Sequence, residues 1–210
     1  ASRFVLFASS LLMAAWTVTP TGGLAAAAPA VAGRAQAESQ KLNTIFDEYF
    51  EAYLQQNPIL ATSIGDPRYN DRFVVGISPA AIAAEEKLHR DYLARLQTVD
   101  RAALPAADQL SYDIFRTGRE REIEGFKFPD ELIPLNQFYS TPNSFAQLGS
   151  GNGMQPFKTV QDYDNFLKRL DGFVAWADQA IVNMKEGVKR GYTLPEVLAE
   201  RTLPQLEAHI

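Results

Sequence analysis

Histidines and carboxylates are the residues with which proteins most often bind metals and move protons. The chain contains 210 residues, among them two histidines and no cysteine. Glu85 precedes His89 by four residues, a spacing that places both side chains on one face of a helix and could supply two metal ligands. No third ligand is evident in the sequence beside them. A hydrogen-bonded histidine at the edge of the core is the interpretation that the pattern favours.

The second histidine, His209, follows Glu207 by two residues, a spacing that directs the two side chains to roughly opposite sides of a helix. The zinc-peptidase motif needs two histidines four positions apart, with a glutamate beside the first to activate the bound water. This motif is absent from the sequence. We therefore expect neither a catalytic residue nor a metal site in this chain. The lack of cysteine also excludes disulfides, a thiol nucleophile and the lipid-attachment motif of lipoproteins.

Two further patterns have a chemical and a structural interpretation. Asp162, Asp164 and Asn165 resemble the start of a calcium loop, but the later glycine and the closing glutamate are missing. Acidic residues stabilised at the start of a helix explain them more simply. The glycine-rich residues 149–153 could cradle a phosphate, but no strand precedes them and no helix opens directly after them. A mobile loop is the favoured interpretation.

Asn136 and Gln137 are the candidate substrate-binding residues. The two amides lie in an apolar stretch without regular periodicity, and buried amides need hydrogen-bond partners. They could bond the backbone of a bound peptide, or they could satisfy only polar groups of their own loop. The sequence leaves both possibilities open.

One long helix is predicted over residues 159–190. Its large apolar residues recur every three or four positions, which forms a stripe down a helix. The members of this stripe are Tyr163, Phe166, Leu167, Leu170, Phe173, Val174, Ala177, Ile181, Met184 and Val188. Thr159 and Asp162 form a capping signal, and Gly191 stands where a left-handed cap is expected. A helix with so wide a stripe requires other helices against it.

The rest of the mature chain is predicted to be helical as well. Helices are expected over residues 39–56, 58–64, 79–98 and 106–125, and a last one opens with a capping box at residues 193–196. Residues 126–158 are rich in aromatic residues, prolines and glycines, and we expect an irregular segment packed on the helices. The predicted fold is mainly α, with antiparallel helical hairpins around the long helix.

The first 37 residues have the composition of a bacterial export signal. Arg3 precedes an apolar run of fifteen residues, and small residues suited to cleavage follow it. A membrane anchor is the alternative, but the run is shorter than the roughly 20 residues needed to span a bilayer. The sequence thus predicts a periplasmic or secreted protein that is not a lipoprotein. Residues 38–210 would be the mature part.

Charge excludes two classes of partner. Residues 1–37 hold two of the 20 basic residues and none of the 25 acidic ones, so the rest of the chain has a formal net charge of −7. Nucleic acids and anionic membranes attract proteins chiefly through positive charge. We therefore expect neither as a partner of the mature protein.

Several short motifs, in this order and spacing, resemble one bacterial family. They include Asn57-Pro58, Ala61-Thr62, Gly65-Asp66 with Arg68, Tyr112-Asp113, Pro134-Leu135-Asn136-Gln137, Tyr163 with Leu167, Arg169 and Leu170, and Met184-Lys185-Glu186-Gly187 with Gly191. From about residue 42 onward the chain resembles the N-terminal part of the family catalogued as domain of unknown function 885.

The resemblance implies a function for a longer parent protein. Members of that family are similar to helical zinc metallopeptidases of the carboxypeptidase kind, many of them exported. Their metal-binding helix lies in a C-terminal half to which nothing in this chain corresponds. The resemblance therefore implies that residues 38–210 are a scaffold and one wall of a peptide-substrate cleft, with zinc bound elsewhere in the parent. The alternatives are a non-enzymatic periplasmic module that binds peptides or a partner protein, and a structural helical protein without a ligand.

Overall fold

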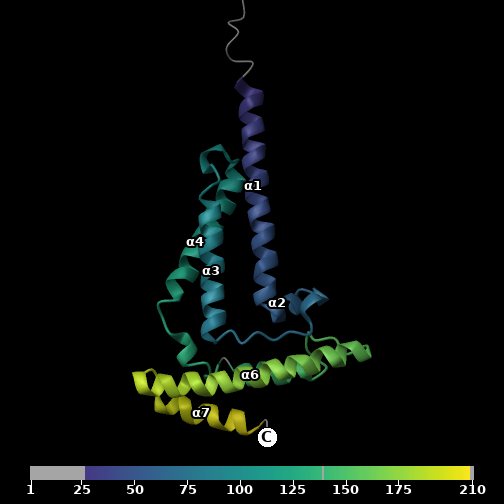
Figure 1. Cartoon of the computed structure of the whole chain (residues 1–210), viewed down its shortest axis with the longest axis vertical. Helices are drawn as coiled ribbons and strands as arrows, with labels where there is room; N and C mark the ends of the chain where they lie inside the picture. The colour runs from purple at the N-terminus through teal and green to yellow at the C-terminus, as the bar shows by residue number, and fades with distance from the viewer. Residues whose placement is uncertain (1–26, 139, 209–210) are drawn as a thin grey trace, which may run out of the picture.

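The fold consists of helices joined by short 3-10 turns (Figure 1). The structure is a computed structural model that describes residues 27–138 and 140–208, the first four of them by their backbone only. The helices in chain order are α1 (Ala27–Gln56), α2 (Pro58–Ser63), α3 (Pro79–Leu96), α4 (Ala106–Gly125), α5 (Thr141–Gly149), α6 (Val160–Arg190) and α7 (Glu196–Glu207). No strand occurs in the described ranges, so the mainly α class predicted from the sequence is confirmed.

Three helices form the upright part of the molecule. Figure 1 shows α1, α3 and α4 running along the long axis, with α3 beside both of the others. Leu42 and Ile45 of α1 and Leu96 of α3 are almost fully buried in the core between them, and Phe46 and Phe115 pack against this core with ring centroids 4.9 Å apart. Burial of such large apolar side chains is the main force that holds helices together.

The long helix lies across the lower end of these three helices, with α7 beneath it (Figure 1). Its N-terminus carries the predicted capping box, in which the Thr159 hydroxyl accepts from the Asp162 N–H and the Asp162 carboxylate accepts from the Thr159 N–H. Its C-terminus ends at Gly191, whose φ of 75° is the left-handed conformation that glycine adopts without strain. Both predicted ends of α6 are thus confirmed.

An extended segment, residues 72–77, connects the two parts by running along α6. The Arg72 carbonyl accepts from Arg169 Nε at 3.1 Å, and the Ile77 carbonyl accepts from Asn183 Nδ2 at 2.8 Å. Between these points a Cβ on Gly172 would lie 2.7 Å from the Cβ of Phe73. Only glycine at this position lets the segment approach the helix so closely.

The main differences from the sequence prediction concern α1, α5 and α7. Helix α1 begins at Ala27 rather than near residue 39. Residues 27–38 are rich in alanine, which is the strongest helix former. The predicted irregular segment contains α5, whose first turn is capped by the Ser140 hydroxyl. Helix α7 has no side-chain cap, so the predicted capping box is wrong, and the helix continues through Pro204, where the sequence indicates an interruption.

The predicted export signal falls mostly on residues 1–26, outside the described residues. Of the part that the structure describes, Arg34 forms an ion pair with Asp100. Across the described helices, we find no stretch both long enough and apolar enough to cross a membrane.

Candidate functional site

A buried arginine organises the junction between α2, the segment after it and α6. The Arg169 side chain is fully buried and donates to the carbonyls of Pro58, Tyr69 and Arg72, to the Thr62 hydroxyl and to the Gln155 side-chain oxygen. Burial lowers the pKa of Arg169 to about 10, while the nearby charge of Asp71 opposes that effect. The side chain therefore remains charged at neutral pH.

The partners of Arg169 stand next to residues that line an apolar pocket. Pro58 precedes Ile59, Arg72 precedes Phe73, and Gln155 follows Met154. Arg169 therefore holds in place three of the segments from which the pocket is built.

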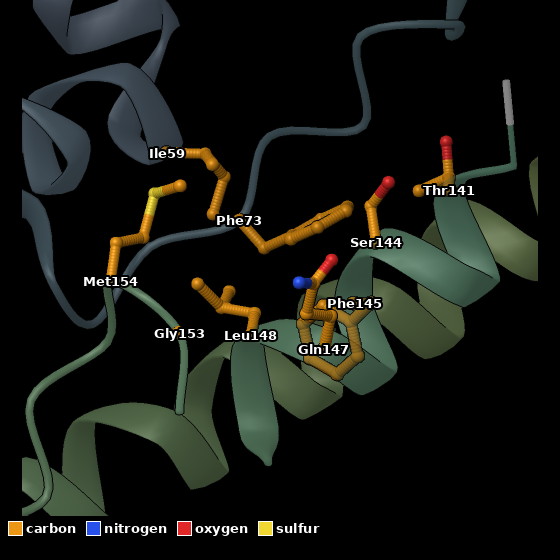
Figure 2. A pocket seen from close by; sticks show the side chains of 9 residues that line it. All are labelled: Ile59, Phe73, Thr141, Ser144, Phe145, Gln147, Leu148, Gly153 and Met154. Carbon is orange, nitrogen blue, oxygen red and sulfur yellow. The ribbon is translucent and has the colours of Figure 1, made fainter. Parts of the chain in front are cut away.

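Figure 2 shows the pocket between α2, the extended segment, α5 and the loop that follows α5. It has a volume of about 420 Å³. Its walls are mostly apolar, and its polar groups come from α5. The lining residues are Ile59, Phe73, Thr141, Ser144, Phe145, Gln147, Leu148, Gly153 and Met154.

The pocket wall is fixed by stacked aromatic rings. Phe145 is buried, and its ring lies parallel to that of Phe173 of α6 at a centroid distance of 4.4 Å. Phe73 meets Phe145 edge to face at 5.4 Å. Such contacts hold rings in defined orientations.

The chemistry of this pocket suits binding rather than catalysis. Among the described residues that line it, none is acidic, basic or a histidine. A largely apolar pocket with a few hydroxyl and amide groups is typical of sites that accept an apolar side chain and hydrogen-bond its backbone. The prediction of no catalytic residue is untested by this observation, since the pocket is only one surface of the chain.

Asn136 and Gln137 lie outside this pocket. The Asn136 side-chain oxygen accepts from the Phe138 N–H at 2.8 Å, and the Gln137 carbonyl accepts from Gln205 Nε2 of α7 at 3.3 Å. Both residues are half-buried. These bonds serve the loop and its contact with α7, and the predicted role in substrate binding stays a prediction.

The metal-ligand candidates do not form a cluster. Among the described residues, no three histidine and carboxylate side chains lie where they could hold a metal ion. His209 lies outside the described residues. His89 is buried rather than at the edge of the core, and its Nε2 lies 3.9 Å from Glu85 Oε1, beyond hydrogen-bond distance. The expected hydrogen bond is therefore wrong for His89.

Asp162 has a structural role. Its carboxylate accepts from the Thr159 N–H at 2.8 Å and the Lys158 N–H at 3.0 Å, as a helix cap does. These bonds, the Thr159 N–H first, hold the pKa of Asp162 below its usual 3.8. The interpretation as a helix-start acid is thus supported over a calcium loop.

The buried role of Arg169 and the pocket were both missed from the sequence. The one signal in the sequence for the role of Arg169 was its position between Phe166 and Phe173. This spacing places the arginine on the apolar side of the predicted long helix. The pocket itself left no local signal, because its lining comes from four segments spread over nearly 100 residues.

Comparison with known proteins identifies one family. A family model with the description "Bacterial protein of unknown function (DUF885)" matches residues 58–210. Neither the curated proteins nor the solved structures include a match to this chain.

Proposed function

The chain belongs to the DUF885 family of bacterial proteins of unknown function, and from this premise we propose that it supplies the scaffold and one wall of the substrate cleft of an exported zinc-dependent peptidase. In this role the chain binds part of the peptide, while the zinc and the groups that activate water belong to the remainder of the parent protein. Zinc would polarise the peptide carbonyl and activate a bound water.

The observation that carries the cleft role is the apolar pocket of Figure 2. Its volume of about 420 Å³ falls in the range of small-molecule sites and accommodates an aromatic or large aliphatic side chain. The hydroxyls of Thr141 and Ser144 and the amide of Gln147 can bond the polar backbone of a peptide.

A second feature supports the scaffold role. Eight large apolar residues on α6 are exposed, and all but Val182 recur at spacings of three, four or seven, which places them on one face of the helix. These seven are Val160, Tyr163, Leu167, Leu170, Val174, Ile181 and Val188. We name this row the α6 seam. Val174 is 54% exposed and Val188 is 67% exposed. Contiguous exposed apolar surface marks a contact with another element, and we propose that the remainder of the peptidase domain covers it.

Peptide binding by the pocket can be tested with the 210-residue chain. We expect N-acetyl-phenylalanine amide to bind at least about tenfold more tightly than N-acetyl-alanine amide, because the larger side chain buries more apolar surface. Chemical-shift titration measures both affinities. Ser144→Phe should block the pocket, whereas Ala146→Phe, on an exposed position of the same helix outside the lining, should not. Equal affinity for both amides would remove the support for a side-chain pocket.

The peptidase role needs a separate experiment. We expect the reading frame to continue beyond codon 210 into a His-Glu-x-x-His motif, and the longer product to hydrolyse peptides in a chelator-sensitive way. The 210-residue chain alone should neither hydrolyse peptides nor retain stoichiometric zinc by elemental analysis. A stop codon directly after codon 210, together with binding of the aromatic amide, would favour the alternative of a non-enzymatic peptide-binding module.

A further inference from the structure

The α6 seam follows the seven-residue repeat of a coiled coil. In such a repeat the apolar positions, named a and d, alternate at steps of three and four residues. The a positions of α6 are Val160, Leu167, Val174, Ile181 and Val188, and the d positions are Tyr163, Leu170, Ala177 and Met184. Ala177 and Met184 are half-buried, and the others are the exposed residues of the seam. Four of the five a residues are β-branched, as is preferred at this position in two-stranded coiled coils.

A row of aspartates borders the seam. Asp164, Asp171 and Asp178 occupy the e position of three successive heptads, and Lys185 occupies the next one. Each aspartate lies four residues after one a residue and three before the following one, so it neighbours both on the helix surface. All three are exposed, and none has an ion-pair partner among the described residues. We call these three aspartates the acidic flank.

The other side of the seam is closed by the chain itself. The residues at the g positions are Phe166, Phe173, Ala180 and Gly187. Phe166 and Phe173 pack on Phe145 of α5, and a Cβ on Gly187 would lie 2.7 Å from the Tyr192 carbonyl oxygen. A partner of α6 therefore meets the seam and the acidic flank, and the charge of that one flank selects it.

This asymmetry disfavours a second copy of the chain as the partner. In a parallel pair the e position of one helix faces the g position of the other, and the g positions of α6 are covered. In an antiparallel pair the two acidic flanks would face each other, and like charges repel.

An apolar hollow lies at the C-terminal end of the seam. Its volume is about 280 Å³, and its lining includes Leu132, Leu135, Met184, Val188 and Leu194. Val188 belongs to the seam, so the row of exposed side chains leads into this hollow. A side chain projecting from a partner helix can fill it, as a knob fills a hole in a coiled coil.

We propose that one long helix, apolar in heptads and basic on the side that meets the acidic flank, packs along the α6 seam. The inference rests on the proposed function, because it places this helix in the remainder of the parent protein. The seam extends over residues 160–188, about 42 Å along the axis, so the partner helix needs about four heptads. Its lysines or arginines pair with Asp164, Asp171 and Asp178.

Two synthetic helices test this chemistry on the 210-residue chain. Both have four heptads with isoleucine at a and leucine at d, and they carry either lysine or glutamate at all e and g positions. Like charges at these positions keep each peptide from pairing with itself. We expect the lysine peptide to bind at least about tenfold more tightly than the glutamate peptide, as measured by fluorescence anisotropy of the labelled peptides. Salt should reduce the difference, because it screens exposed charges.

Reversal of the acidic flank should reverse this preference. The triple variant Asp164→Lys/Asp171→Lys/Asp178→Lys should bind the glutamate peptide more tightly than the lysine peptide. Loss of the apolar contact is tested separately, because Val174→Lys/Ile181→Lys should weaken the binding of both peptides. Circular dichroism of each variant verifies that the helices are intact.

A matched control separates the acidic flank from the net charge of the chain. Glu120→Lys/Glu122→Lys/Glu124→Lys makes the same change in charge at three exposed positions of α4. This variant should retain the preference for the lysine peptide. Equal affinity of the unmodified chain for the two peptides would overturn the inference, and so would a preference that the α4 variant reverses as well.

Two further outcomes identify what fails. A dimer of the unmodified chain in analytical ultracentrifugation, absent in Val174→Lys/Ile181→Lys, would assign the seam to a second copy and overturn the inference. A stop codon directly after codon 210 would overturn the proposed function and the source of the helix, whereas the preference for the lysine peptide would remain. Loss of that preference in a chain whose reading frame continues would overturn this inference alone.

Discussion

Arg169 illustrates how this protein keeps a charge in its interior. Among the described residues, the groups that accept its hydrogen bonds are neutral oxygens, and they come from three separate stretches of the chain: α2, residues 69–72 and the loop at Gln155. An arginine has five donors in a planar fork, so one side chain can bond several oxygens at once. Three residues from the motifs that resemble the family therefore meet at one point in space: Pro58, Thr62 and Arg169.

Removal of this side chain should destabilise the whole junction. We expect Arg169→Ala to lower the free energy of unfolding by about 3 kcal/mol or more, because several buried acceptors lose their donor. Lys168→Ala is the matched control, since its exposed side chain lies 3.5 Å from Asp71 and should change stability by less than about 1 kcal/mol. Urea unfolding followed by circular dichroism measures both values. Similar losses in the two variants would contradict the role of Arg169.

Alanine substitutions at two glycines test the close packing at the pocket. Gly153 lines the pocket, and Gly118 of α4 is the control. A Cβ on Gly153 would lie 2.8 Å from the Gln147 carbonyl oxygen, whereas a Cβ on Gly118 would meet nothing within 4 Å. We expect Gly153→Ala to destabilise the chain by about 1–3 kcal/mol through this clash. Gly118→Ala should stabilise it by up to about 1 kcal/mol, because alanine is the better helix former. The melting temperatures should therefore move in opposite directions, and a shared direction would refute the packing argument.

At the scale of elements, α6 is apolar on two faces. Phe166 contacts the Phe145 ring of α5, and Phe173 and Trp176 pack with apolar residues of the extended segment, while the α6 seam remains exposed. The single stripe predicted from the sequence is therefore divided between a buried and an uncovered face. Both faces are presented by one rigid helix whose ends are fixed by caps.

The N-terminal cap of α6 should make the free energy of unfolding depend on pH. Hydrogen bonds, that from the Thr159 N–H first, hold the pKa of Asp162 below its usual 3.8. The stabilisation is therefore complete above about pH 4 and is lost as the pH falls through the lower folded-state pKa. We expect Asp162→Asn to reduce stability at neutral pH and to flatten its decline in acid, as measured by urea unfolding between neutral and strongly acidic pH. Asp164→Asn, outside the cap, should retain the decline of the unmodified chain.

At the scale of the whole molecule, the α6 seam lies on α6, and the apolar pocket lies among α2, α5 and the segments between them. The upright helices α1, α3 and α4 have a core of their own, with Leu42, Leu96 and Leu104 almost fully buried. The lower part has a second core around Trp176 and Ala180. The α6 seam belongs to neither, which is why we assign it to a contact with further polypeptide.

Lysines placed in the seam test this assignment. The double variant Val174→Lys/Ile181→Lys should keep the free energy of unfolding of the 210-residue chain within about 1 kcal/mol, because both side chains are exposed. Trp176→Ala, one of its neighbours on the buried face, should lose about 3–5 kcal/mol. Binding of a hydrophobic dye should fall in the lysine variant. In the longer protein that we propose, the same two lysines should be strongly destabilising, and a neutral effect there would show that the seam is not covered.

The sequence alone determined the features that depend on neighbouring residues. The mainly α class, the limits of α4 and α6, the Thr159 cap and the left-handed Gly191 all follow from local periodicity and capping chemistry, which act within a few residues along the chain. Helix α5 was missed because the aromatic and glycine-rich residues around it hide the short capping signal of Ser140.

Only the tertiary structure decided what lies together. The apolar pocket and the five partners of Arg169 join residues that are far apart in the chain. The periodicity of α6 could not show which half of its stripe is buried, because an apolar residue looks the same in sequence whether a neighbour covers it or not. That distinction depends on how the helices pack, since burial is a property of the surrounding elements rather than of the residue itself.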